Sequence, residues 1–96
     1  FGMFGGKDEK VRILVHNDLA GVMIDRFGRD IMMIPADDEH ITINVDVRVS
    51  RQFLAWVFSL GPQVKILGPA EVVTAMQEET RRMVEQYGIS KTNETE

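Results

Sequence analysis

The 96-residue sequence contains no cysteine and only three prolines, one tryptophan and one tyrosine. The missing cysteines exclude disulfides, thiolate metal sites and cysteine nucleophiles, and they favour a cytoplasmic protein. No apolar run approaches the about 20 residues of a membrane helix, and the first residues lack the pattern of a signal peptide. Basic residues are fewer than acidic ones: 11 Lys and Arg and 15 Asp and Glu give a net charge of −4. This balance argues against a domain that coats DNA, and we expect no membrane contact.

What remains is the composition of one globular domain with a single core, with 44% hydrophobic and 27% charged residues. The glycine-rich start FGMFGG indicates a linker. We therefore expect residues 1–9 to be a linker from an upstream domain and residues 10–88 to form the folded domain. Residues 89–96 are polar, and we expect them to be a disordered tail.

Alternation of apolar and polar residues predicts the strands. It is cleanest over residues 40–49, where β-branched side chains occupy every second position. Similar but shorter patterns predict strands over residues 10–16, 30–36 and 63–67.

Helical spacing of apolar residues predicts three helices. The first is expected to be capped by Asn17 or Asp18 and to end at Gly28. The second follows Ser50 as its N-cap and covers residues 51–60. The third covers residues 70–87, with a predicted inner stripe of Val73, Met76, Thr80, Met83 and Tyr87.

The resulting order is βαββαβ followed by a C-terminal helix. A hairpin between the second and third strands, with two right-handed crossovers, gives a four-stranded antiparallel sheet of order 4-1-3-2. The predicted fold class is therefore α+β, a ferredoxin-like split βαβ sandwich with helices on one face of the sheet.

Motifs for catalysis or cofactor binding are missing from the sequence. It contains no phosphate loop, dinucleotide loop or paired-histidine metal motif. His16 and His40 are expected at adjacent ends of neighbouring strands, but two histidines without a third ligand seldom hold a metal. Asp37, Asp38 and Glu39 indicate a solvated turn rather than a calcium site. We expect a protein that is not an enzyme and has no cofactor and no metal.

The sheet face opposite the helices carries the candidate contact residues. Alternation places cations, amides and apolar groups there, and the candidates for contact with a ligand or partner are Arg12, Arg48, Lys65, His16 and Asn44. This face could be an ordinary solvated surface, an interface, or a site for an anion or nucleic acid. It lacks the stacking aromatics of an RNA-recognition module. Trp56, on an amphipathic helix, is interpreted as an anchor in the core or an interface rather than a cofactor contact.

Residues 56–69, WVFSLGPQVKILGP, resemble the signature W-hydrophobic-L-S-F-G-P-x-V-x-V-L-x-P of the WCX domain, the WYL C-terminal extension. The strand over residues 11–15 is similar to the family's opening VRLRF strand. The FGMFGG start resembles the FGVFxG segment that joins a preceding WYL domain to the WCX domain. The turn over residues 37–40 departs from the pattern, because it lacks the glycine common there.

The resemblance implies the C-terminal regulatory module of a bacterial transcription regulator, after a winged helix-turn-helix and a WYL sensing domain. It implies a contribution to dimerisation and to effector coupling, through a homodimer or an interdomain contact with the WYL domain. The implied effector is a nucleotide or single-stranded nucleic acid, and only the N-terminal domain would bind operator DNA. The alternatives are a stand-alone ferredoxin-like domain that binds a small molecule and, least favoured, a small enzyme.

Overall fold

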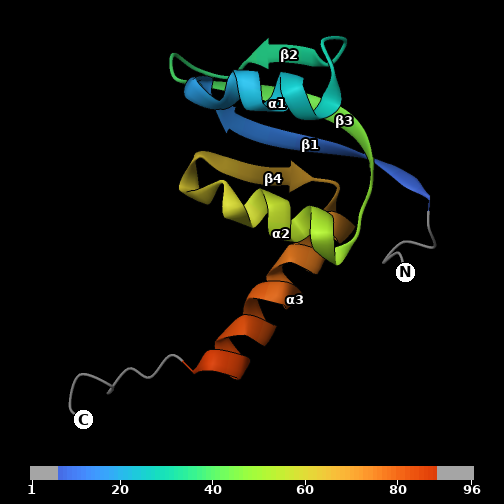
Figure 1. The fold of residues 1–96 in the computed structure, drawn as a ribbon, viewed down its shortest axis with the longest axis vertical. Coiled ribbons are helices and arrows are strands. Elements are labelled where there is room, and N and C mark those ends of the chain that lie inside the picture. Colours follow the sequence, from blue (N-terminus) through green and yellow to red (C-terminus); the bar gives the residue numbers. More distant parts are fainter. Residues whose placement is uncertain (1–6, 89–96) are drawn as a thin grey trace.

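A computed structural model, drawn as a ribbon in Figure 1, describes residues 7–88 of the chain. The expected linker residues 1–6 and the expected tail, residues 89–96, lie outside this part. The elements are β1 (Asp8–His16), a 3-10 turn (Asn17–Leu19), α1 (Ala20–Phe27), β2 (Met32–Pro35), β3 (His40–Arg48), α2 (Arg51–Ser59), a second 3-10 turn (Gly61–Gln63), β4 (Val64–Gly68) and α3 (Ala70–Tyr87).

The four strands form one antiparallel sheet in the order β2-β3-β1-β4. This order confirms the predicted one and the ferredoxin-like α+β fold. Helices α1 and α2 lie on the same face of the sheet, as Figure 1 shows. The opposite face therefore remains open over the two central strands.

Two strands differ in length from their predictions. β1 begins at Asp8 rather than residue 10, because its pairing with β3 continues to the partners Asp8 and Arg48. β2 covers only Met32–Pro35, since its pairing with β3 spans just four residues. The expected linker and second strand are both shortened by these boundaries.

The predicted cap of the first helix is wrong. A 3-10 turn separates β1 from α1. The Nδ1 atom of the His16 ring accepts a hydrogen bond from the Asp18 amide, with 3.1 Å between the two nitrogens. The Asn17 side chain instead donates to the Asp38 carbonyl at 3.1 Å. An imidazole at the end of the strand thus takes the role of the expected cap. The other predicted cap is confirmed, because Ser50 Oγ accepts the Phe53 amide at 3.2 Å.

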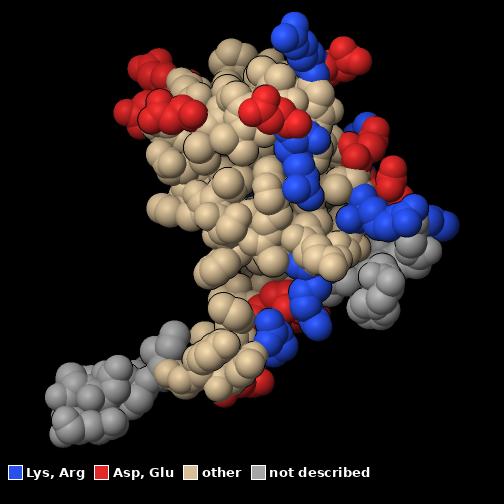
Figure 2. Space-filling view, in the orientation of Figure 1, with Lys and Arg blue, Asp and Glu red and all other residues tan. Residues whose placement is uncertain are grey.

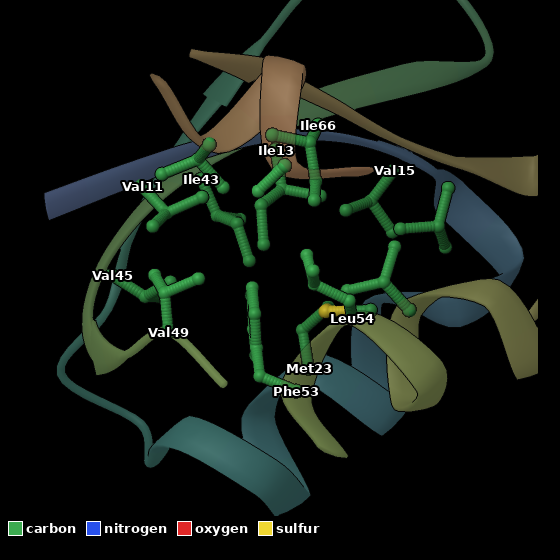
Figure 3. Packing of buried hydrophobic residues seen from close by; sticks show 14 residues of the cluster. Val11, Ile13, Val15, Met23, Ile43, Val45, Val49, Phe53, Leu54 and Ile66 are labelled. Atoms are coloured by element: carbon green, nitrogen blue, oxygen red, sulfur yellow. The ribbon is translucent and has the colours of Figure 1, made fainter. Parts of the chain in front are cut away.

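The core lies between the sheet and the helices α1 and α2, as Figure 3 shows. From Val11 to Val15, every second residue of β1 is fully buried, which follows from the period-two alternation in the sequence. The buried hydrophobic side chains are Val11, Ile13, Val15, Met23, Ile43, Val45, Val49, Phe53, Leu54, Val57, Val64, Ile66, Val72 and Ala75.

The predicted inner stripe of α3 is wrong over its second half. The buried residues of this helix are Val72 and Ala75, whereas Thr80 and Met83 are exposed and Tyr87 keeps 75% of its surface. In Figure 1, α3 starts behind α2 and then runs away from the body. Only its first turns therefore reach the core, and the later apolar residues have no neighbour from the sheet.

No helix within residues 7–88 is both long and apolar enough to cross a membrane.

Candidate functional site

The open face of the sheet is formed by the strand residues that point away from α1 and α2. Most of their immediate neighbours in sequence lie in the core or pack against it, and the pairing across the strands puts these strand residues on one face. We use "open face" for Asp8, Lys10, Arg12, Leu14, His16, Met32, Ile34, His40, Thr42, Asn44, Asp46, Arg48, Lys65 and Leu67.

Arg12, Asn44 and Lys65 come together in the middle of this face. Arg12 pairs directly with Asn44 across β1 and β3. Lys65 pairs with Leu14, two residues further along β1, which corresponds to about 7 Å. The Arg12 side chain also reaches over β4, because its Nη2 lies 3.8 Å from where a Cβ on Gly68 would stand. The structure thus places two cations and one amide around Leu14.

The two cations of this group have no ion-pair partner among residues 7–88. The salt bridges in that part of the chain involve Lys10, Arg51 and Arg82 and the two histidines, and none includes Arg12 or Lys65. A cation without a neighbouring carboxylate keeps its charge available for an anion. The arrangement can therefore bind a phosphate or carboxylate group.

Arg48 lies at a different end of the open face. Its partner across the sheet is Asp8. It is four residues from Asn44 along β3, which corresponds to about 13 Å. The nearby Lys10 is held by Asp46, with 3.2 Å between Nζ and Oδ1. The structure therefore does not bring Arg48 together with Arg12 and Lys65.

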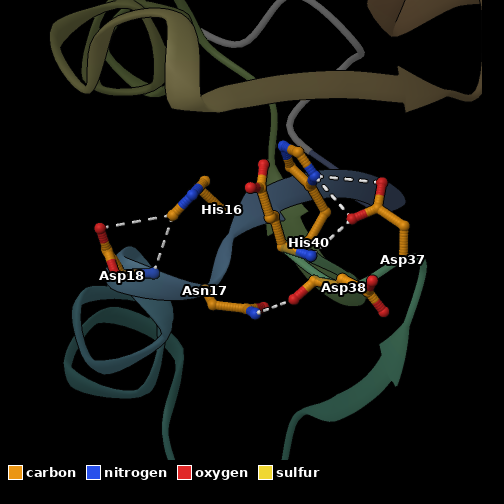
Figure 4. A network of polar contacts seen from close by, with 7 residues as sticks. His16, Asn17, Asp18, Asp37, Asp38 and His40 are labelled. Atoms are coloured by element: carbon orange, nitrogen blue, oxygen red, sulfur yellow. Dashed lines mark hydrogen bonds and ion pairs between the residues drawn. The ribbon is translucent and has the colours of Figure 1, made fainter.

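His16 and His40 lie at the opposite rim, where Figure 4 shows their rings close together. Their centroids are 5.4 Å apart and their planes meet at 81°, which confirms the predicted approach. Each Nδ1 is occupied, by the Asp18 amide for His16 and by the Asp37 carboxylate at 2.9 Å for His40. Within residues 7–88 no three His, Asp or Glu side chains are placed to hold a metal.

The β2–β3 turn is built on Asp37 instead of a glycine. Its Oδ1 accepts the Glu39 amide at 2.7 Å, and the Ala36 amide donates to the His40 carbonyl at 2.9 Å. The Glu39 amide, helped by the His40 ring, lowers the pKa of the Asp37 carboxyl below its usual 3.8. Because no described non-glycine residue has a positive φ, this side-chain turn needs no glycine.

Trp56 joins the two helices that cover the sheet. Its ring makes an edge contact with Phe27 of α1, with centroids 5.5 Å apart, and a tilted contact with Phe53 at 6.3 Å. The Arg26 guanidinium lies 4.5 Å from the centre of the Trp56 ring. These contacts place two aromatic rings and a cation around the Trp56 ring, as expected of a packing anchor.

The family model of the WCX domain matches residues 7–84 of this chain. The chain belongs to the WCX domain family. The match includes all four strands and all but the last three residues of α3. No curated protein matches the chain.

Two surfaces of this WCX domain were missed in the sequence. Met32 and Ile34 keep 62% and 46% of their surface on β2, although the apolar run over residues 31–34 gave no sign of two faces. A groove of about 310 Å³ also lies between α2 and the second half of α3. It was missed because the stripe of α3 was assigned to the core. The signal available was Phe58, an apolar residue that helical spacing places off the face shared by Phe53, Trp56, Val57 and Leu60.

Proposed function

We propose that this WCX domain is the C-terminal regulatory module of a bacterial WYL-domain transcription regulator. In this role it contributes to dimerisation and couples the binding of an anionic effector to the rest of the protein. Membership of the family supports the regulatory role. The observation that carries effector coupling is the juxtaposition of Arg12, Asn44 and Lys65 on the open face, with no carboxylate paired to either cation among the described residues.

The chemistry of this group suits a phosphate-bearing effector. The Arg12 guanidinium offers a planar pair of donors for phosphate oxygens, and the Lys65 ammonium adds a second charge. The Asn44 amide can both donate to and accept from a base or sugar. Leu14 supplies apolar surface between Thr42 and Lys65. The effector class is a nucleotide or single-stranded nucleic acid.

The role is non-enzymatic. The titratable groups with lowered pKa values, Asp37 and Glu79, are held by hydrogen bonds in a turn and between helices, where they serve the fold. Operator DNA is bound by another domain of the regulator, in agreement with the net charge of −4 here. The partners are a second copy of the protein or its WYL domain.

The test is effector binding by the full-length regulator, measured by titration against a panel of nucleotides and short single strands. Charge reversal at both Arg12 and Lys65 is expected to weaken binding at least about tenfold, because charge-assisted hydrogen bonds are lost and repulsion is gained. The matched control is Arg29→Glu, an exposed cation outside the open face. Unchanged affinity in the Arg12→Glu, Lys65→Glu protein would overturn effector coupling through this face.

Substitution of Arg48 distinguishes a nucleotide effector from a single-stranded nucleic acid. It lies about 13 Å from the Arg12 position along the strands, beyond the reach of one phosphate group at the centre. A single nucleotide should therefore bind Arg48→Glu normally. A single-stranded nucleic acid that crosses the open face should bind the Arg48→Glu protein more weakly than the unchanged protein. It should also bind the double variant, Arg12→Glu with Arg48→Glu, more weakly.

A further inference from the structure

His16 and His40 face each other across β1 and β3, at the end of the sheet where two turns meet. They are the last pair in the register of these strands, and Figure 4 shows both rings beside the β1–α1 and β2–β3 turns. The Asn17 amide donates to the Glu39 carbonyl at 2.8 Å, so the two turns are also joined through the backbone. The histidine pair thus lies at a joint between the two turns.

Hydrogen bonds fix where each ring carries its proton. The Asp18 amide donates to Nδ1 of His16 at 3.1 Å, so this nitrogen has a lone pair and the neutral ring is protonated at Nε2. The Asp37 carboxylate can only accept, so Nδ1 of His40, 2.9 Å from its Oδ1, carries a proton. The two rings are therefore held in opposite tautomers.

The opposite tautomers give the two rings different responses to an added proton. Neither Nε2 has a hydrogen-bond partner within residues 7–88. In that part of the chain no side-chain nitrogen is both buried and without a partner, so both Nε2 atoms reach solvent. His40 takes the proton at Nε2 and keeps its hydrogen bond to Asp37. His16 takes the proton at Nδ1, and the Asp18 amide then loses its acceptor.

A second partner for the charged His16 ring lies on the same neighbouring residue. The Asp18 carboxylate Oδ2 is 3.6 Å from Nδ1 of His16, close enough for a charge-assisted hydrogen bond after a small rotation. The neutral ring accepts from the Asp18 amide, whereas the charged ring donates to the Asp18 carboxylate. The turn therefore has two alternative hydrogen-bonding states that differ by one proton.

Charged groups from both turns and from β4 surround the two rings. The exposed acids at this end of the sheet are Asp18, Asp37, Asp38 and Glu39. Figure 2 shows acidic side chains gathered here, over the β2–β3 turn and the start of α1. The nearest cation from β4 is Lys65, which pairs with Leu14 and is the diagonal neighbour of His16 on the open face. The two ring centroids are 5.4 Å apart, so a charge on either ring also acts on the other.

We propose that His16 is a proton-operated cap of the β1–α1 turn, which exchanges the Asp18 amide for the Asp18 carboxylate when the ring becomes charged. Helix α1 has no side-chain cap of its own, so the His16 contact is the side-chain cap of the segment that leads into it. Histidine is the side chain that ordinarily changes charge near neutral pH. The device needs no ligand and is independent of the proposed effector site.

NMR spectroscopy of the 96-residue chain between about pH 8 and about pH 5 tests the exchange. At the upper end, the ring nitrogen resonances should show a lone pair on Nδ1 of His16 and a proton on Nδ1 of His40. As the His16 ring becomes charged, the hydrogen-exchange protection factor of the Asp18 amide should fall at least about fivefold, because one capping hydrogen bond is lost. The Asp18 carboxyl carbon resonance should move with the same midpoint.

The same substitution at each ring gives a matched pair of variants. His16→Asn keeps a side-chain acceptor at the cap position and does not titrate, so the Asp18 amide should stay protected at every pH. His40→Asn removes the other titrating ring and should leave the pH response of the Asp18 amide in place. Thermal melts establish that both variants are folded.

Three results would overturn the proposed cap exchange. They are a proton on Nδ1 of His16 at the upper pH, constant protection of the Asp18 amide across the titration, and a loss of protection that persists in His16→Asn. The first two are measured on the unchanged chain and do not depend on how a variant folds. The effector titration with the Arg12→Glu, Lys65→Glu protein is a separate experiment, so failure of either proposal leaves the other standing.

Discussion

Arg51 of α2 donates a hydrogen bond to Glu79 of α3, with 3.1 Å between Nε and Oε2. Arg82 approaches the other oxygen of the same carboxylate at 3.1 Å. The surroundings of Glu79 remove water and so raise its pKa, but the hydrogen bonds from Arg51 and Arg82 outweigh this effect and lower the pKa below 4.5. The carboxylate therefore links α2 to the middle of α3.

Replacing Glu79 by Gln is expected to lower the melting temperature at pH 7. A carboxyl whose pKa is lower in the folded protein stabilises it above the unfolded pKa, and this contribution is lost as the pH falls through the folded value. The difference in melting temperature between Glu79→Gln and the unchanged protein should therefore shrink as the pH falls below 4.5. Circular dichroism melts measure it, with the exposed neighbour Glu78→Gln as the control. A constant difference across pH would contradict this account.

We predict that substitutions of Asp37 in the β2–β3 turn lower the melting temperature to different degrees. Asp37→Ala removes the acceptor of the Glu39 amide and should lower the melting temperature. Asp37→Asn keeps an acceptor oxygen and loses only the charge, so its effect should be smaller. Because the folded pKa of Asp37 is lowered, the charge contribution is full above 3.8 and disappears below it. Asp38→Asn, which changes a side chain outside these hydrogen bonds, is the control, and an equal loss in all three variants would refute the turn's role.

Trp56 is predicted to be the main contact between α1 and α2. Trp56→Ala should lower the free energy of unfolding by about 2–3 kcal/mol, less than for a fully buried tryptophan because the ring is half-buried. Arg26→Gln removes only the cation over the ring and should cost about 0.5–1 kcal/mol. Urea unfolding followed by circular dichroism measures both losses. Tryptophan fluorescence cannot be used for both variants, because Trp56→Ala removes the sole tryptophan. Equal losses of unfolding free energy in the two variants would show that the Trp56 ring contributes little by its packing.

Ile13 is predicted to be critical for folding. It is fully buried, on the central strand β1, and its cross-strand partner Ile43 is fully buried as well. Ile13→Ala should reduce the free energy of unfolding by about 3–5 kcal/mol, a large share of the stability of a small domain. The control Met32→Ala, at an exposed position of β2, should change it by less than about 0.5 kcal/mol. Urea midpoints of the two variants should differ clearly.

The strands and the open face could be predicted because alternation is a local property. The pattern over residues 40–49 required one buried and one outward face, and the structure has β3 over His40–Arg48. The outward positions of Arg12, Asn44 and Lys65 followed from the same pattern. Their meeting around Leu14, and the separation of Arg48 from them, needed the register of the strands. Register depends on pairing between distant segments, which a single-strand pattern does not contain.

The sequence by itself determined the order of elements, the two faces of the sheet and the Ser50 cap, because periodicity and capping act within a few residues. Only the tertiary structure decided that His16 rather than Asn17 or Asp18 serves the first turn, that Asp37 replaces a glycine, and that α3 leaves the core after Met76. An apolar stripe predicts that one face of a helix is buried, but it does not identify the surface that covers this face. In α3 the stripe runs beyond the edge of this fold, and for that reason its second half is surface.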